Sequence, residues 1–478
     1  MIRLAVLYIE NKWYSRNIDT TDDYYENHKF GSDDLILTFQ SSELIRHLKT
    51  FKQFRKWPEI VDLEGFDKQM TQEGKDLREY KKWTMLEALK YHNILDPDFK
   101  LSLSTIREFL GGMGILYLYM LNQKPEEINR FNDLEAQINN VIYRRQLRGV
   151  PINLNLAGNL CADLEKEIYR IKNILQLKYR IFNPENERWQ SEYLKSKGYR
   201  LVKSALFTFK AWRNNDEICS LMYDMIRNQK DFDSLLFMQS HWGGGSCAYP
   251  KYLGFGTITS RIILREPSFQ NLRKSNRKVV VAERFHKLLY IDYSQFEAGI
   301  LASLSDDPKL IDLYNTDIYE DLANFVFGDP KKRSDAKVVF YRYMYGDTTL
   351  DLKAQLYFKK FIKLQEFKEK IDKEMADNSR VGTSLGNFRI KGEEQVTWAL
   401  SHVIQATASL IYKNALMRVA NELDRAKFLI PMHDGTVYQI SNLWYDSLKP
   451  KIEGVYLEEF VKVCPKIKAK VNMKDVFD

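Results

Sequence analysis

At 478 residues the chain is longer than one hydrophobic core usually spans, so we expect two or more domains. With 44% apolar and 28% charged residues it has the balance of a folded, water-soluble protein and not of a disordered one. Lysine and arginine total 72 against 64 for aspartate and glutamate, and this net charge of +8 attracts phosphate backbones only if it is concentrated in a groove.

Three further features bear on where such a chain works. No uninterrupted apolar stretch is long enough to cross a bilayer, so no membrane association is expected. The N-terminal segment lacks the cleavage site of a secretory signal and the acid-poor character of a transit peptide. The four cysteines form no CxxC pair and have no His at ligand spacing: Cys161, Cys219, Cys247 and Cys464. Structural zinc and a disulfide framework are therefore not expected, and a cytoplasmic location in a bacterial or phage-infected cell fits.

The predicted elements of the first half change from mixed to helical. Residues 1–125 alternate short β-like and helix-like runs: Leu4–Glu10, Leu35–Phe39, Ser42–Phe54 and Thr84–His92. From Asn132 to Tyr179 the apolar spacing is helical and is interrupted at 148–151, which predicts two long helices around a turn. The stretch His241–Thr259 is rich in glycine and aromatic residues and is predicted to form loops and hairpins.

A compact apolar strand, Lys287–Ile291, is predicted to deliver Asp292 at its end, before a helix that begins near Gln295. A carboxylate beside a freed backbone carbonyl, that of Tyr293, suits a hard cation such as Mg²⁺. The alternative is a surface aspartate that caps the next helix, and this segment alone does not decide between the two.

Two short β-like runs, Phe428–Met432 and Thr436–Ile440, flank His433, Asp434 and Gly435 and predict a hairpin. The helical pattern Glu394–Lys427 precedes them. An ordinary Asp-Gly turn is common, so this signal is weak by itself. Two aspartates on adjacent strands of one sheet can, however, bridge two cations, which clamp the attacking and leaving oxygens of a phosphoryl displacement.

A third segment, GDPKKRSDAKVVFYRYMYGDT, is predicted to form one helix with a capping signal at each end. Asp329 is a candidate N-cap with Pro330 at the first helical position, and Gly346 stands where a C-terminal glycine belongs. Between them four residues recur at every fourth position and share one face: Arg333, Lys337, Tyr341 and Tyr345. Two cations followed by two aromatic rings suit a triphosphate at one end and a base at the other, although a plain amphipathic helix is the competing interpretation.

Taken together, these segments resemble the family A DNA polymerases, the Klenow-type enzymes. DYSQFEAGILA resembles that family's first palm motif, RSDAKVVFYRYMYG its fingers helix and MHDGTVY its second palm motif. TITSRIILREPSFQNL, the stretch 404–408 and RRQLRGVPIN resemble further segments of the family in the same order. The resemblance runs from Arg144 to Ile440, and the order and spacing of the motifs carry it more than any single motif.

The resemblance implies a role for each matching residue. Asp292 and Asp434 would hold two Mg²⁺ ions, with Mn²⁺ as an alternative, and the carbonyl of Tyr293 would complete one shell. Three catalytic residues are thereby implied: Asp292, Asp434 and Lys337, the last also as the general acid for the pyrophosphate. The implied nucleotide-binding residues are Arg333, Lys337, Tyr341, Gln295, Glu297 and Tyr319. Glu297 would lie under the sugar and exclude a ribose hydroxyl, with a hydrogen bond to Tyr345, and a tyrosine at 341 implies ready acceptance of dideoxynucleotides.

A further set of matching residues would line the primer–template, with Tyr345 at the template position. These implied DNA-binding residues are Thr259, Arg261, Gln270, Asn271, Tyr345, Gly346, Gln405 and His433. Such contacts can read base-pair shape through minor-groove acceptors that nearly all pairs share. Taken one by one, each of these polar residues is more often structural.

The sequence departs from the family pattern at three places. Gly435 replaces the family's usual glutamate and removes a third carboxylate. Tyr319 stands where a phosphate-contacting histidine is usual, which puts one triphosphate contact in doubt. Phe340–Tyr341–Arg342 replaces Asn-Phe-Gly in the fingers helix and adds bulk and a charge. None of these changes removes the two metal carboxylates or the cationic pair.

The N-terminal third is predicted to be a reduced or divergent exonuclease-like domain without proofreading. Family members often carry there an exonuclease built on an Asp-x-Glu strand. Here Tyr8–Ile9–Glu10 matches that strand with its first aspartate lost. Asp62–Leu63–Glu64 has the pattern, but too little chain follows to complete such a domain, so an ordinary charged turn is the preferred interpretation.

The resemblance implies an α+β, right-hand polymerase fold with a small N-terminal α/β domain. Residues 1–125 form the N-terminal domain and 126–478 the polymerase domain, with the thumb near 130–240, the palm near 241–314 and 396–478, and the fingers near 315–395. The implied activity is primer extension with deoxynucleoside triphosphates on primer–template DNA. The active form is expected to be a monomer, and both phage or plasmid replication and gap-filling repair fit it. Processivity partners are left open. Two alternatives remain: a single-subunit RNA polymerase or primase of the same clan, and a catalytically silent DNA-binding relative. Glu297 speaks against the first, and the retained carboxylates and cations speak against the second.

Overall fold

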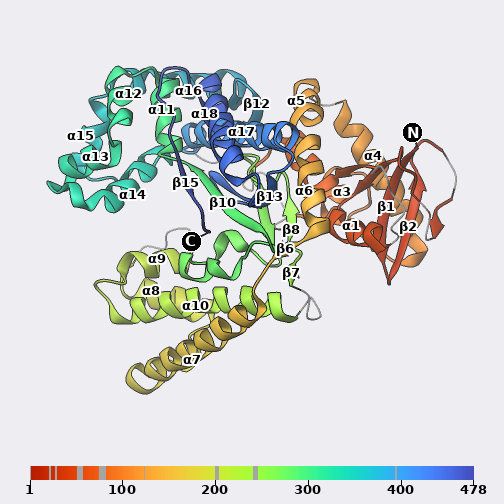
Figure 1. The fold of residues 1–478 in the computed structure, drawn as a ribbon, viewed down its shortest axis with the longest axis horizontal. Helices are drawn as coiled ribbons and strands as arrows, with labels where there is room; N and C mark the ends of the chain where they lie inside the picture. The colour runs from red at the N-terminus through yellow and green to blue at the C-terminus, as the bar shows by residue number, and fades with distance from the viewer. Residues whose placement is uncertain are drawn as a thin grey trace. The chain divides into compact units, whose positions relative to one another are not determined.

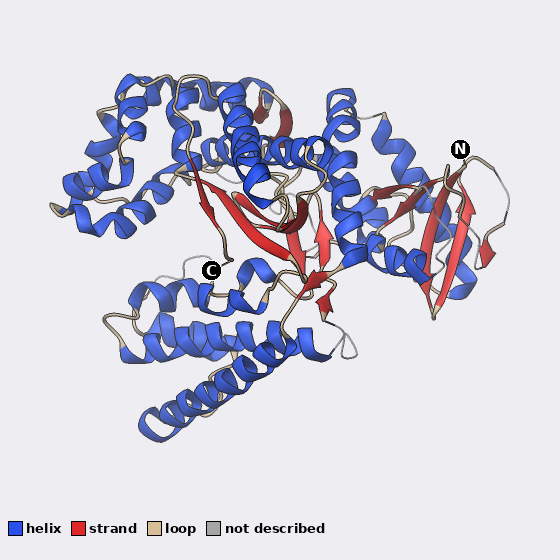
Figure 2. Cartoon of the chain, in the orientation of Figure 1, coloured by secondary structure: helices blue, strands red, loops and turns tan. Residues whose placement is uncertain are grey.

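A computed structural model of the chain describes residues 2–20, 23–26, 30–50, 58–74, 82–122, 124–199, 204–240, 246–392 and 396–477. Helices predominate and the strands gather into separate sheets, so the chain is an α+β protein (Figure 2). It divides into two compact units. The first comprises Met1–Leu147, Tyr252–Ile263 and Leu289–Asp475, and the second Arg148–Lys251, Leu264–Leu288 and Val476–Asp478.

The N-terminal part of the first unit is built on a five-stranded sheet in the order β3-β2-β1-β4-β5 (Figure 1). The strands are Arg3–Ile9 (β1), Lys12–Asn17 (β2), Tyr25–Glu26 (β3), Leu35–Thr38 (β4) and Glu59–Asp62 (β5). β1 runs antiparallel to β2 and parallel to β4, which is itself parallel to β5. Parallel strands are buried on both faces, and every residue of β4 is buried. The predicted strands at 4–10 and 35–39 are confirmed to within one residue at each end.

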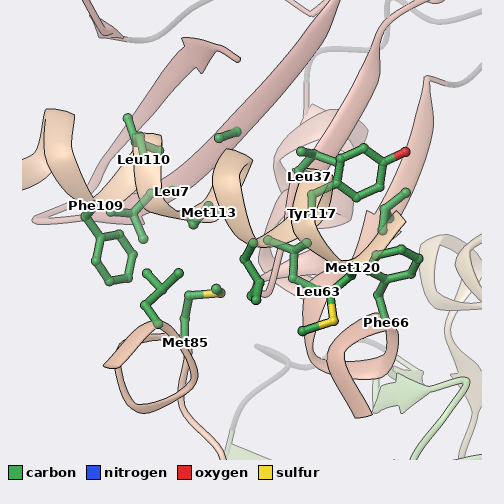
Figure 3. Packing of buried hydrophobic residues seen from close by; sticks show 14 of the residues in the cluster. Leu7, Leu37, Leu63, Phe66, Met85, Phe109, Leu110, Met113, Tyr117 and Met120 are labelled. Carbon is green, nitrogen blue, oxygen red and sulfur yellow. The ribbon is translucent and has the colours of Figure 1, made fainter. Parts of the chain in front are cut away.

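Four helices accompany this sheet: Ser41–Thr50 (α1), Leu63–Thr71 (α2), Met85–Tyr91 (α3) and Ile106–Leu121 (α4), the last after the short helix η1 (Leu103–Thr105). Leu7 and Leu37 of the sheet belong to one apolar core with Phe66, Met85 and Met113 of the helices (Figure 3). The helix predicted at 84–92 is confirmed. The helix predicted at 42–54 is confirmed to residue 50, and residues 51–54 lie outside the described residues.

A helical stretch then leads out of the N-terminal part through α5 (Pro125–Arg130), a π-helical turn η2 (Phe131–Glu135) and α6 (Ala136–Arg148). The second unit opens with β6 (Val150–Pro151) and α7 (Leu154–Tyr179). Two long helices were predicted around a turn at 148–151, and the helices are confirmed. The turn prediction was wrong in part, because residues 150–151 pair antiparallel with β7 (Cys247–Ala248).

The second unit is mainly helical. Besides α7 it contains α8 (Glu187–Ser196), α9 (Ala205–Trp212), α10 (Glu217–Ser240), η3 (Phe269–Asn271) and η4 (Lys274–Val279). Ile171 and Leu175 of α7, Phe209 of α9 and Met222 of α10 share a buried core. The loops and hairpins predicted at 241–259 include the short strand β8 (Lys251–Leu253), which pairs with β9 (Ile263–Arg265). Residues 241–245 of that prediction lie outside the described residues.

A four-stranded sheet in the order β13-β14-β10-β15 belongs mainly to the first unit. Its strands are Lys427–Pro431 (β13), Gly435–Ser441 (β14), His286–Tyr293 (β10) and Val471–Lys474 (β15). β13 and β14 form the predicted antiparallel hairpin, with Phe428 opposite Tyr438. Asp292 was expected after the end of its strand, but it lies within β10 and pairs with Asn472 of β15.

Helices and one small hairpin complete the first unit. They are α11 (Phe296–Ser305), α12 (Pro308–Asn315), α13 (Ile318–Phe327), η5 (Pro330–Lys332), α14 (Arg333–Met344), α15 (Leu352–Lys359), α16 (Ile362–Asn378), β11 (Arg380–Thr383), β12 (Gly386–Ile390), α17 (Ala399–Glu422) and α18 (Tyr445–Val463). α17 is shorter than the helix predicted at 394–427, of which residues 394–395 lie outside the described residues. Asp329 accepts a hydrogen bond from the amide of Lys331, so the predicted cap begins η5, which continues into α14.

Within the ranges that the structure describes, no helix combines the length and the apolar character that crossing a membrane requires.

Candidate active site

Asp292 and Asp434, far apart in the chain, lie on neighbouring strands. Asp434 occupies the turn that leads into β14, and β14 is the sheet neighbour of β10, which carries Asp292. The amide of Tyr293 donates a hydrogen bond of 3.1 Å to the carbonyl oxygen of Asp434. The predicted proximity of the two aspartates is therefore confirmed at the level of the backbone.

Gly435 allows this close approach of the two strands. A Cβ atom at position 435 would overlap the carbonyl oxygen of Ile291 and would lie 2.8 Å from Cα and 3.0 Å from Oδ1 of Asp292. No side chain fits there without moving β14 away from β10. The missing third carboxylate is therefore linked to the backbone geometry that brings the two aspartates together.

A half-buried arginine lies between Asp434 and a third carboxylate. The Nη2 atom of Arg261 donates a hydrogen bond of 2.5 Å to Oε1 of Glu297 and is 3.7 Å from Oδ1 of Asp434. Burial raises the pKa of Glu297 to about 7, with Asp434 adding to the rise and Arg261 opposing it. Glu297 thus takes Arg261 as its partner, whereas the hydroxyl of Tyr345, its expected partner, accepts a 2.7 Å hydrogen bond from Gln405.

The cationic face of α14 meets one buried aromatic ring. The guanidinium carbon of Arg333 is 5.1 Å and the ammonium of Lys337 5.7 Å from the ring centroid of Tyr319. Arg333 also donates a 2.8 Å hydrogen bond to Asp317, whose side chain caps α13 by accepting from the amides of Tyr319 and Glu320. The four-residue spacing therefore places both cations on the side of α14 that contacts α13, as periodicity predicts.

The aromatic half of the same face continues toward the carboxylates. The rings of Tyr341 and Tyr345 stack with centroids 6.1 Å apart, and the ammonium of Lys337 is 5.9 Å from the Tyr341 ring. Burial raises the pKa of Tyr341, and the charges of Glu297 and Asp434 raise it further. Lys337 in turn favours the ionised form of Glu297 and so opposes the rise in its pKa. The helix face and the carboxylates therefore belong to one electrostatic environment.

Comparison with known proteins agrees with this arrangement. Residues 246–475 match the sequence profile of DNA polymerase family A. This matched region contains the aspartate-bearing strands β10 and β14 and the cationic helix α14.

Residues 246–475 belong to DNA polymerase family A.

Relatives of known function agree with this assignment. The chain is 25% identical over 356 residues to DNA polymerase I of Caldicellulosiruptor bescii, an alignment that covers 64% of this chain and 42% of that protein. It is 22% identical over 464 residues to DNA polymerase I of Helicobacter pylori, covering 85% of this chain and 49% of that one. The chain thus spans less than half the length of these relatives.

A solved structure agrees at the level of the fold. The POL domain of Pol1 from M. smegmatis, solved in complex with DNA primer-template and dNTP, superposes with a TM-score of 0.75 at 14% identity. The match covers 99% of this chain and 95% of that one. The chain therefore has the right-hand polymerase fold.

Several of the predicted site residues have structural partners. Gln295, in the left-handed conformation (φ 49°), accepts a 3.2 Å hydrogen bond at its side chain from the amide of Ile318. The hydroxyl of Tyr293 donates to the carbonyl of Tyr456. Thr259 is buried beside Thr257.

The remaining predicted DNA-contacting residues divide between the two units. His433 is exposed at the turn between β13 and β14. At Gly346 (φ 70°) a Cβ atom would overlap the carbonyl of Thr397. Gln270 and Asn271 lie in the second unit, where Gln270 accepts a hydrogen bond from the amide of Leu264. They are not assigned here to the site of the first unit.

The carboxylates of Asp292 and Asp434 meet one requirement of a cation site. Oδ1 of Asp434 is buried and makes no hydrogen bond, and Oδ1 of Asp292 lies against the backbone of Gly435, the residue that follows Asp434. Carboxylate oxygens are hard donors of the kind that Mg²⁺ or Mn²⁺ prefers. Among the described residues no group of three or more His, Cys, Asp or Glu side chains could hold a metal, so the pair alone would supply the carboxylates.

Sequence reasoning missed Asp317, and it assigned Tyr319 a role different from the one its surroundings indicate. Asp317 carries no motif signal, because its partner Arg333 lies on the following helix and only the fold joins them. Tyr319 stands where the family usually has a phosphate-contacting histidine, and it was kept among the nucleotide-binding candidates with that contact in doubt. Its side chain is only 1% exposed and packs edge-on against Phe340 at 5.4 Å, so it lies beneath the two cations and is not available to a phosphate.

Proposed function

We propose that this chain is a template-directed DNA polymerase that extends a primer with deoxynucleoside triphosphates through two divalent metal ions. The observation that carries the proposal is that Asp292 and Asp434 adjoin at the neighbouring strands β10 and β14, with Asp434 and Lys337 of α14 both acting on Glu297. Membership of family A agrees with it. Primer–template DNA and deoxynucleotides are the proposed partners, and a monomer is the proposed form.

In this proposal the site assembles a negatively charged substrate against a negatively charged pocket. Asp292 and Asp434, with the carbonyl of Tyr293, would hold the ions, which supply activation of the primer hydroxyl and neutralisation of phosphate charge. Arg333 and Lys337 bind the triphosphate, and Lys337 donates a proton to the departing pyrophosphate.

Selectivity follows from the residues between the helix and the sheet. Tyr341 packs against the incoming sugar and base, and Tyr345 lies at the template position. Glu297 is 2% exposed and is held by Arg261, so its side chain occupies a fixed volume where a ribose hydroxyl would enter. This favours deoxynucleotides over ribonucleotides and therefore favours a DNA polymerase over an RNA polymerase or primase. Closure of the fingers over a correct pair adds induced fit.

We further propose that the N-terminal domain does not proofread. Tyr8 takes the position of the first exonuclease aspartate, and its ring packs on Trp13 with centroids 4.9 Å apart. Glu10 lies beyond the end of β1 in the left-handed conformation (φ 50°). Asp62 caps α2 by accepting from the amide of Gly65, as an ordinary turn carboxylate does. Degradation of a mismatched primer in the absence of nucleotides would contradict this part of the proposal.

The deciding experiment is extension of a labelled primer on DNA and RNA templates, with each nucleotide type, with and without Mg²⁺ or Mn²⁺. The variants Asp292→Ala and Asp434→Ala should abolish extension while the affinity for primer–template stays largely intact. The variant Asp351→Ala serves as the control, because its carboxylate caps α15 by accepting from the amide of Ala354 and lies outside the proposed site. Normal synthesis by either aspartate variant, or no synthesis by the natural chain, would refute the proposal.

A further inference from the structure

A buried charged cluster lies directly behind the arginine that contacts Glu297 and Asp434. The ammonium of Lys413 donates hydrogen bonds of 2.5 Å to Oε2 of Glu135 and to Oγ of Ser260. The hydroxyl of Ser260 donates one of 2.6 Å to Oε1 of Glu135. Lys413 and Ser260 are 0% exposed and Glu135 is 2% exposed, so water reaches none of these groups.

The positive and negative charges within the cluster balance. Arg130 donates a 2.6 Å hydrogen bond to Glu135 and pairs with Glu127 at 2.8 Å, so two cations face two carboxylates. The ring of Phe255 lies 5.6 Å from the guanidinium of Arg130 and 5.7 Å from the ammonium of Lys413. Burying such charges costs more free energy than an apolar core of the same size, so a contribution to stability does not by itself explain the cluster. A buried polar network can instead hold the residues around it in one local geometry.

The geometry that the cluster fixes is that of Ser260. Its φ is +62°, a conformation that a residue other than glycine seldom adopts. The amide of Ser260 donates to the carbonyl of Thr257 at 2.9 Å, and the amide of Arg261 donates to the hydroxyl of Thr257 at 3.1 Å, so the turn is closed from both sides. Both polar contacts of the Ser260 hydroxyl go to the cluster, which therefore holds the residue in this conformation.

The direction of the next side chain depends on that backbone conformation. Arg261 follows Ser260 immediately, and its carbonyl accepts a 2.9 Å hydrogen bond from the amide of Gly256. With the main chain fixed on both sides, the guanidinium extends to Glu297 and Asp434. A different φ at Ser260 would rotate Arg261 away from both carboxylates.

We propose that Glu135, Lys413 and Ser260 form a positioning cluster that aims Arg261 at Glu297 and Asp434 and thereby sets the selectivity of the site for the sugar. None of the three touches the substrate or the metal in this account, and they act only through Arg261. The proposal rests on the proposed function for its kinetic readout, but not for its structural one.

The kinetic test is a double-mutant cycle between Ser260→Gly and Arg261→Ala. Glycine adopts positive and negative φ about equally, so Ser260→Gly removes the hydroxyl without adding strain and leaves the turn free to depart from its native φ. We expect Ser260→Gly to lower the ratio of deoxynucleotide to ribonucleotide incorporation by about tenfold, the effect of one lost charge-assisted hydrogen bond. In the Arg261→Ala background, Ser260→Gly should not change the ratio further, because the side chain through which Ser260 acts on the site is already absent.

Effects that multiply in the double variant would overturn the proposal, since a merely structural serine would act independently of Arg261. Ser401→Ala is the matched control. Its hydroxyl is also buried in the first unit and donates to a backbone carbonyl, that of Trp398, so its removal should leave the ratio unchanged. Lys413→Met should reproduce the loss seen with Ser260→Gly, and an unchanged ratio in Lys413→Met would equally count against the cluster.

A readout without catalysis separates this proposal from the proposed function. If the natural chain extends no primer, the proposed function fails, and crystal structures of the natural chain and of Ser260→Gly still decide the positioning role. Loss of the contact between Arg261 and Glu297 in the variant supports the cluster. An Arg261 that stays within hydrogen-bond distance of Glu297 overturns it.

Discussion

Arg261 donates a 2.5 Å hydrogen bond to Glu297, the residue that we propose selects the sugar. Asp434 lies 3.7 Å from the same Nη2 atom, so one guanidinium faces a buried and a half-buried carboxylate. The pair explains how a carboxylate can serve as a steric element, because an unpaired glutamate would not hold one position in a buried site.

The first prediction separates the volume of Glu297 from its charge. Glu297→Ala should increase ribonucleotide incorporation at least about tenfold, because the volume that excludes the hydroxyl is lost. Glu297→Gln keeps the volume and should retain most of the exclusion. Competitive incorporation of ribo- and deoxynucleotides opposite one template base measures both. Equal ratios for the alanine variant and the natural chain would remove Glu297 from sugar selection.

The second prediction concerns the ionisation of Glu297, whose pKa is raised from 4.5 to about 7 chiefly by burial. A carboxyl group with a raised pKa in the folded state binds more protons there than in the unfolded state. Stability should therefore fall as pH rises from 4.5 to 7 and change no further through this group above 7. Thermal unfolding between pH 5 and 8 should be less pH-dependent in Glu297→Gln. An identical pH dependence in both proteins would contradict the raised pKa.

The third prediction is that a carboxylate cannot be restored at position 435. A Cβ atom there would overlap the carbonyl of Ile291, so Gly435→Ala should already lower stability by about 1–3 kcal/mol and reduce extension, and Gly435→Glu should do so more strongly. The control is Gly454→Ala in α18, where a Cβ atom would meet nothing within 4 Å. This substitution should stabilise the helix by about 0.5–1 kcal/mol. Higher activity of Gly435→Glu would show that the strands can separate.

The fourth prediction tests Tyr319 as the support of Arg333 and Lys337. Tyr319→Phe keeps the aromatic ring under both cations, so the KM for deoxynucleotides should change little. Tyr319→Leu removes the ring and should raise KM about tenfold with a smaller effect on kcat, the size of a desolvated cation–π contact. Steady-state kinetics on a single-base template measures the effects on KM and kcat separately. A phenylalanine variant as impaired as the leucine variant would assign the effect to the hydroxyl, which is hydrogen-bonded to Tyr341.

Features that depend on local spacing could be predicted from the sequence. The four-residue repeat of α14 and the Asp-Gly hairpin of β13 and β14 follow from helix and strand periodicity, which acts over a few residues. The adjacency of Asp292 and Asp434 followed once two short apolar strands were recognised beside them. The two metal-binding roles stay predictions.

Features that depend on pairing between distant segments could not be predicted. Residues 150–151 form a strand only because 247–248 lies beside them, and a turn signal cannot reveal that partner. The Arg261–Glu297 pair and the contact of Lys413 with Glu135 join residues far apart in the chain. Neither carries a local pattern, since an ion pair needs only proximity in the folded state.

The fifth prediction concerns the stability supplied by Lys413. Removing one partner of a buried ion pair leaves an uncompensated charge, so Lys413→Met should lower the free energy of unfolding by about 3–5 kcal/mol. The double variant Glu135→Gln, Lys413→Met should lose less than the sum of the two single variants, because it leaves no unpaired carboxylate.

The pH dependence of that stability has a defined sign. Burial lowers the pKa of Lys413 from 10.5 to about 8, against the opposing effect of Glu135. Between pH 8 and 10.5 the unfolded chain therefore binds more protons at this lysine than the folded chain, and this group's contribution to stability should rise with pH across that window. Thermal unfolding from pH 7 to 10 should show this contribution in the natural chain and not in Lys413→Met. A difference between the two proteins that is constant with pH would mean that Lys413 titrates in the folded state as it does in the unfolded one.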